Sequence, residues 1–171
     1  MKYLLPLLCC CLVAEAQSFK VYELLIPKDK IESFANPQEM IQAAERGGAT
    51  ITAYADLPKS KNGVWSIDQT YSVRYAEELD SSGHPVTFVD RKVGIEVQIE
   101  LEADGSFDVT YCHTRLEAWI PFRGHEGSFL PIFTTTQVSP APIQIDDYII
   151  MGGLANQDGV LNIIIQKIES K

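Results

Sequence analysis

Long stretches of the chain alternate between apolar and polar residues, the pattern of strands with one buried and one solvated face. The clearest case runs from Val93 to Leu101, turns at Ala103-Asp104-Gly105 and returns from Phe107 to Ile120. A second alternating segment, Trp65 to Tyr75, follows Asn62-Gly63, a dipeptide typical of tight hairpins. We therefore expect Trp65–Tyr75 to pair with the apolar segment before that turn. Further apolar runs predict strands at Val21–Ile26, Ile132–Val138, Ile143–Met151 and Val160–Ile168.

One segment has the three-to-four-residue apolar spacing and the end signals of a helix. Asn36 is a suitable N-cap, Pro37 suits the first helical position, and Glu39 completes a capping box. Gly47-Gly48 is expected to end the helix after Arg46.

These elements predict a mainly β (α+β) fold. It would be an antiparallel meander of about eight strands, with one short helix packed near its N-terminal side. Residues 77–85 and 121–131 are expected to be loops, and Gly152-Gly153 to break the strand before it. We expect one domain over residues 17–171.

The first sixteen residues resemble a secretory signal peptide. Lys2 gives a positive start, Leu4 to Val13 is mostly apolar, and Ala14-Glu15-Ala16 predicts cleavage before Gln17. Lipid attachment at a cysteine of this segment is a rival interpretation that stays open. Cys112 is the only cysteine after Gln17, so the mature chain has no internal disulfide. We expect an exported protein in the periplasm or outer membrane of a Gram-negative-type bacterium.

The acidic composition removes two classes of partner. The formal net charge is −9 at pH 7, and no basic cluster interrupts it. A nucleic-acid-binding protein needs basic groups to neutralise phosphates, so we exclude that class. An anionic membrane surface would repel the chain for the same reason.

No arrangement of reactive residues predicts an enzyme. His84, His113 and His125 fall in separate elements, which does not match the spacing of a metal site. Cys112 and His113 are neighbours on a strand and therefore face opposite sides. His113 shares its row with Arg115 and Glu117, which predicts a solvated face. We expect no catalytic residue, no cofactor and no metal.

Two strands near the C-terminus carry a more specific pattern. A Thr-rich strand ending in Val138 is followed by a turn, an apolar strand and Gly-Gly-Leu. This order resembles the C-terminal β-domain of bacterial secretins, the ring-forming outer-membrane channels of type II and type III secretion systems. The residues that carry the resemblance are Thr134, Thr135, Thr136, Val138, Gly152, Gly153 and Leu154.

The resemblance implies assembly through strands, and it covers roughly residues 38 to 168. The chain departs from the family in having no room for the large N-terminal modules of secretins. Residues 155–159 form a bare turn where secretins have a longer segment. Pro140 and Pro142 stand where the family continues a strand. These departures put pore formation in doubt and favour a stand-alone, shortened secretin-like protein.

Two functions follow. The first is envelope assembly or protein secretion through strand contacts with other subunits or a protein partner, with outer-membrane contact left open. Candidate contact residues are Phe122, Phe129 and Trp119, although both phenylalanines could instead pack on their own sheet. The alternative is a monomeric periplasmic β-sandwich that binds a carbohydrate or other small ligand, with Trp65, Trp119 and Tyr75 as stacking surfaces.

Overall fold

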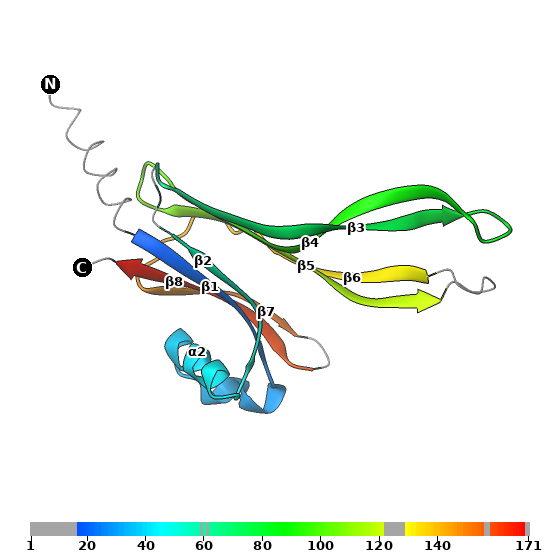
Figure 1. Ribbon diagram of the computed structural model, residues 1–171. Helices are drawn as coiled ribbons and strands as arrows, with labels where there is room; N and C mark the ends of the chain where they lie inside the picture. The colour runs from blue at the N-terminus through cyan, green and yellow to red at the C-terminus, as the bar shows by residue number, and fades with distance from the viewer. Residues whose placement is uncertain (1–16, 59, 61, 122–128, 156–157, 170–171) are drawn as a thin grey trace, which may run out of the picture. The chain divides into compact units, whose positions relative to one another are not determined.

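The described residues form eight strands in two four-stranded antiparallel sheets (Figure 1). The computed structural model describes residues 17–169 except 59, 61, 122–128 and 156–157, so the expected signal segment and Phe122 lie outside it. The first sheet has the order β2-β1-β8-β7 and the second has the order β3-β4-β5-β6. The strands are β1 (Gln17–Ile26), β2 (Thr50–Leu57), β3 (Val64–Leu79), β4 (Pro85–Leu101), β5 (Phe107–Pro121), β6 (Phe129–Val138), β7 (Tyr148–Ala155) and β8 (Val160–Glu169).

The fold class predicted from the sequence is confirmed. Strands dominate, and a single α-helix, α2 (Pro37–Glu45), accompanies them in the described part of the chain, together with a 3-10 helix, η1 (Lys28–Ser33), that the sequence did not reveal. No helix among the described residues has both the length and the apolar character that crossing a bilayer requires.

The residue contacts divide the chain into two compact units. Unit 1 comprises residues 1–67, 97–110 and 138–171, and unit 2 comprises residues 68–96 and 111–137. Strands β3, β4 and β5 contribute residues to both units. The expectation of one domain over residues 17–171 therefore stays a prediction.

Unit 1 is organised around β1, which pairs antiparallel with β2 on one side and with β8 on the other. On one face of β1 the ring of Phe19 meets the ring of Trp65 edge to face, with centroids 4.9 Å apart, and that of Phe107 at 5.5 Å. The Trp65 Nε1–H donates to the Gln17 carbonyl at 3.0 Å. A buried indole normally finds such an acceptor, so Trp65 fastens the start of β1.

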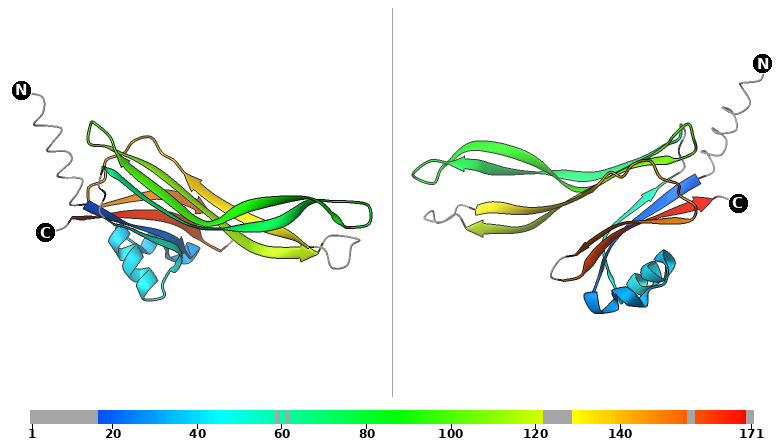
Figure 2. Two further views of the ribbon diagram at one scale, coloured as in Figure 1. Left: turned by 45° about the horizontal axis from the view of Figure 1, so that its top comes forward. Right: turned by 180° about the vertical axis from the view of Figure 1, so that it is seen from behind.

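Helix α2 covers the other face of this sheet, as two views show (Figures 1 and 2). Ile41 packs into a buried cluster with Leu24, Ile26 and Ile164. The predicted cap is confirmed, because the Glu39 backbone N–H donates to the Asn36 side-chain oxygen at 3.0 Å. Burial of one apolar stripe and a satisfied N-terminus explain why so short a segment is helical.

Unit 2 consists of the distal parts of two hairpins, β3–β4 and β5–β6. This unit has only a small apolar core. Among its described residues the buried apolar side chains are Val93, Ile95 and Tyr111. The β3–β4 turn is closed by the Asp80 N–H, which donates to the His84 carbonyl at 2.9 Å. The right-hand view of Figure 2 shows the distal ends of the two hairpins as separate two-stranded ribbons.

Several sequence-based boundaries need correction. The hairpin expected at Asn62-Gly63 is wrong, because this turn connects β2 of one sheet to β3 of the other. Strand β4 begins at Pro85, within the expected loop and well before Val93. Strand β7 begins at Tyr148 rather than Ile143, which forms only an isolated bridge to Phe107.

Candidate partner-binding surface

Unit 2 exposes large apolar side chains on all four of its strands. Such side chains are normal when single, but a concentration of them marks an interaction surface. Most of them lie near the distal ends of the two hairpins, and one, Tyr71, lies on β3 further from the turn. In the described part of unit 2 the exposed large apolar residues are Tyr71, Val86, Phe88, Trp119, Ile120, Phe129 and Ile132.

Trp119 and Phe129, the two candidate contact residues that the structure describes, are among these exposed side chains. Trp119 is 44% exposed near the end of β5, and Phe129 is 51% exposed at the start of β6. Phe129 therefore does not pack fully onto its own sheet. Phe122 lies outside the described residues. Whether Trp119 and Phe129 contact a partner stays a prediction, but both are accessible to one.

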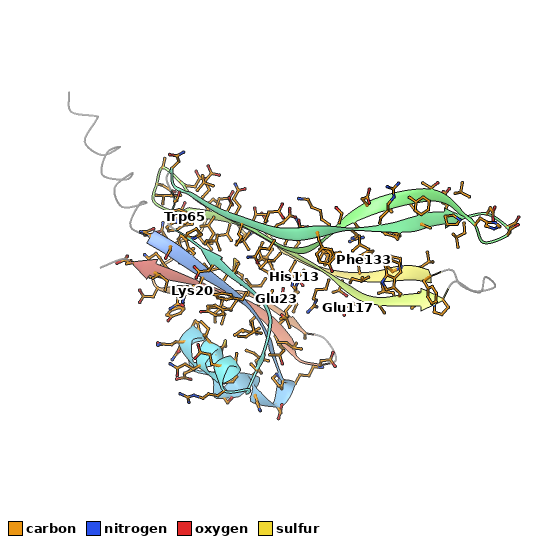
Figure 3. All side chains as sticks on the ribbon, in the orientation of Figure 1. Lys20, Glu23, Trp65, His113, Glu117 and Phe133 are labelled. Atoms are coloured by element: carbon orange, nitrogen blue, oxygen red, sulfur yellow. The ribbon has the colours of Figure 1, made fainter. Side chains whose placement is uncertain are left out.

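Aromatic and cationic side chains join the two hairpins of unit 2. The Phe133 ring on β6, labelled in Figure 3, lies 5.5 Å from the Tyr75 ring on β3. The Arg91 guanidinium of β4 lies over the Phe133 ring, 4.9 Å from its centroid. The cation faces the negative face of the ring, a contact worth about 0.5–1 kcal/mol at an exposed site. These contacts hold one face of each hairpin toward the other.

The Thr-rich strand continues this junction. Thr135 Oγ1 accepts a hydrogen bond from Arg91 Nη2 at 3.2 Å and lies 3.1 Å from Thr114 Oγ1. Of the three threonines, Thr136 is buried, whereas Thr134 and Thr135 are exposed. Val138, the last residue of the motif strand, is half-buried and belongs to unit 1. Thr135 thus has an interaction that the sequence pattern alone did not indicate.

Gly152 and Gly153 do not break β7, contrary to the expectation. The pairing register between β7 and β8 shifts between Gly152 and Leu154, which identifies a β-bulge inside a continuous strand. Both glycines have positive φ, 120° and 89°. A side chain at Gly152 would also approach the Leu161 carbonyl to 3.0 Å. Leu154, the third motif residue, is 54% exposed.

Charged side chains form one small cluster on the solvated side of unit 2. Lys92 Nζ lies 3.1 Å from Asp68 Oδ2 and 2.8 Å from Glu96 Oε1. Hydrogen bonds from Thr70 and then from Lys92 hold the pKa of Asp68 below its ordinary value, and both carboxylates raise the pKa of Lys92. All three side chains are accessible, so the cluster contributes solubility more than stability.

Two of the buried polar side chains, His113 and Glu23, were not expected to be buried from the sequence. His113 is only 8% exposed, so the predicted solvated face is wrong at this position. It continues the buried row of Val109 and Tyr111, since alternate residues share a face. Glu23 is fully buried within the apolar strand β1, where its Oε1 accepts a hydrogen bond from Thr52 Oγ1 at 2.6 Å.

The described residues contain no group of three or more histidine, cysteine or acidic side chains placed to hold a metal. The aromatic set considered for carbohydrate binding is divided. Trp65 is 1% exposed and cannot stack on a ligand, and Tyr75 is half-buried against Phe133. Trp119 alone of the three offers an accessible ring.

Comparison with known proteins adds no relative. Neither a family model, nor a curated protein, nor a solved structure matches the chain.

Proposed function

We propose that this protein is an exported, non-enzymatic, secretin-like assembly protein. It would act in envelope assembly or protein secretion through strand-mediated contacts with other subunits or a protein partner. The observation that carries the proposal is the set of accessible apolar side chains on the four strands of unit 2.

The open edges of both sheets support this function. Strands β2 and β7 end the first sheet, and β3 and β6 end the second, so four strands present backbone groups to further pairing. Two of these edge strands contain features that limit pairing with a further strand: a proline at position 131 in β6 and a bulge at the glycines of β7. Strands β2 and β3 lack a proline, and β3 is 16 residues long.

The resemblance to secretins gives the proposal its direction. The Thr-rich strand and the Gly-Gly-Leu segment occur here in strands β6 and β7, which lie at sheet edges. A role through subunit contacts is consistent with that position. The carbohydrate-binding alternative would need a new stacking surface, because Trp65 is enclosed.

The deciding experiment is the solution mass of the purified protein, measured by light scattering over a wide concentration range. We expect a discrete oligomer whose population rises with concentration. Replacing the accessible aromatics in a Trp119→Ser/Phe129→Ser double variant should lower the extent of association. Ile51→Ser in unit 1, where the side chain is 43% exposed, is the matched control. A monomer at every concentration would contradict assembly by this chain.

A further inference from the structure

Strand β3 offers a long and largely accessible edge in unit 2. It ends the β3-β4-β5-β6 sheet, and its distal residues from Ser72 to Leu79 are exposed or half-buried. Strand β6, at the other end of the same sheet, contains Pro131, which cannot donate a backbone hydrogen bond. Of the two edges, β3 is therefore the better template for another strand.

The β3–β4 turn fixes which backbone groups of this edge point outward. The Asp80 N–H donates to the His84 carbonyl on the β4 side. Residues that bond the neighbouring strand alternate with residues that bond outward. With regular alternation counted back from Asp80, we expect the N–H and C=O groups of Leu79, Glu77, Tyr75 and Val73 to point away from β4. These groups form a regular ladder for a strand added at this edge.

The side chains along this edge would complement those of an identical segment running in the opposite direction. If the same segment of a second copy pairs antiparallel about Ala76, Arg74 stands opposite the partner's Glu78. Val73 stands opposite the partner's Leu79, and Tyr75 opposite the partner's Glu77. A two-fold axis repeats each pair, so two opposite-charge pairs and two apolar pairs form.

Neighbouring registers lack this complementarity. Pairing centred on Arg74 brings two arginines together, and pairing centred on Glu77 or Glu78 brings two glutamates together. Pairing centred on Tyr75 leaves Arg74 opposite alanine and Glu78 opposite serine. Like charges directly opposite one another weaken a strand pair, so the Ala76 register is favoured.

We propose that the protein self-associates by antiparallel pairing of the distal half of β3 with the same segment of a second copy, centred on Ala76. The inference rests on the proposed function and narrows its partner to a second copy of this chain. The contact is isologous, since each copy contributes the same edge. Two hairpin units then share one continuous sheet.

Charge reversal tests the register directly. In Arg74→Glu, residue 74 faces the partner's Glu78 with like charge. In Glu78→Arg, Arg74 faces a second arginine. Each variant alone should dimerise on the order of tenfold to a hundredfold more weakly than the natural protein. An equimolar mixture restores both opposite-charge pairs, so a mixed dimer should form with nearly natural affinity in sedimentation equilibrium.

The mixture also controls for folding, because a variant that had lost its structure could not regain affinity by mixing.

A second test uses Ala76→Cys in a Cys112→Ser background. Residue 76 faces itself across the axis at about 4.5–5.5 Å between Cα atoms, within reach of a disulfide. Ser72→Cys is the control, since its two copies would lie about 27 Å apart.

The outcomes separate this inference from the function on which it rests. Rapid cross-linking at position 76, little at position 72, and recovery on mixing are expected. Association of the natural protein that neither charge variant changes would overturn pairing through β3, while the assembly function would stand. A natural protein that stays monomeric throughout would overturn this pairing and any assembly of identical subunits, and would leave contacts with a different protein as the proposed function.

Discussion

The two units of this protein use β-structure in opposite ways. Unit 1 places β1 between two other strands, covers one sheet face with α2, and encloses Phe19, Trp65 and Phe107 on the other. Unit 2 has few buried apolar side chains and many exposed ones. The comparison teaches that the fold is stabilised mainly in unit 1, while unit 2 keeps apolar surface available for contacts.

The largest expected effect comes from the two tryptophans, one in each unit. Trp65→Ala should lower the free energy of unfolding by about 3–5 kcal/mol, because it removes a buried ring and leaves a cavity. Trp119→Ala should cost less than about 1 kcal/mol, because the side chain is half-exposed. Urea denaturation measures both. Equal losses at the two positions would break the contrast between the units.

A glycine inside β4 tests whether unit 2 is nevertheless tightly constrained. Gly94 has φ 127°, and a Cβ there would lie 2.2 Å from the Gln69 carbonyl oxygen. Gly94→Ala should therefore cost about 3 kcal/mol or more, through strain and overpacking. Gly105→Ala, with positive φ but open surroundings, should cost only about 1–2 kcal/mol. If Gly94→Ala left the free energy of unfolding unchanged, the backbone of the β3–β4 hairpin would have to shift easily to make room for the methyl group.

The smallest expected effect concerns the charged cluster of unit 2. The pKa of Asp68 lies below its ordinary value of 3.8, first because of the Thr70 hydroxyl and next because of Lys92. A carboxylate with a lowered pKa stabilises the folded state above that ordinary value and loses its contribution as the pH falls through the folded pKa. NMR titration should show a higher Asp68 pKa in Thr70→Val and a smaller rise in Lys92→Met. If the Asp68 pKa were the same in both variants as in the natural protein, Thr70 and Lys92 would not be what lowers it.

Elements formed by residues that are close together in the sequence could be predicted from it. Asn36, Pro37 and Glu39 lie within one turn of α2, so the helix could be predicted from its cap. The hairpin of β4 and β5 has alternating strands joined by a short polar turn, so it could be predicted too. Strand β4 begins earlier than expected because both faces of its first half are largely exposed, which removes the alternation.

Long-range pairing could not be predicted in the same way. Strand β1 pairs with β8 from the far end of the chain, and no turn signal reports such a contact. The Asn62-Gly63 turn predicts a reversal but not which sheet the next strand joins. For His113 the signal was present, since the residue lies in the same row as Phe107, Val109 and Tyr111. The row simply continues further into unit 2 than its polar residues indicated.

The enclosure of Trp65 and the exposure of Trp119 have a spectroscopic consequence. These are the chain's two indoles, and each unit contains one. The ring shielded from water should emit at shorter wavelength and resist an aqueous quencher, whereas the accessible ring should emit to the red and be quenched readily. Intrinsic fluorescence therefore reports on the two halves of this molecule separately, without any label.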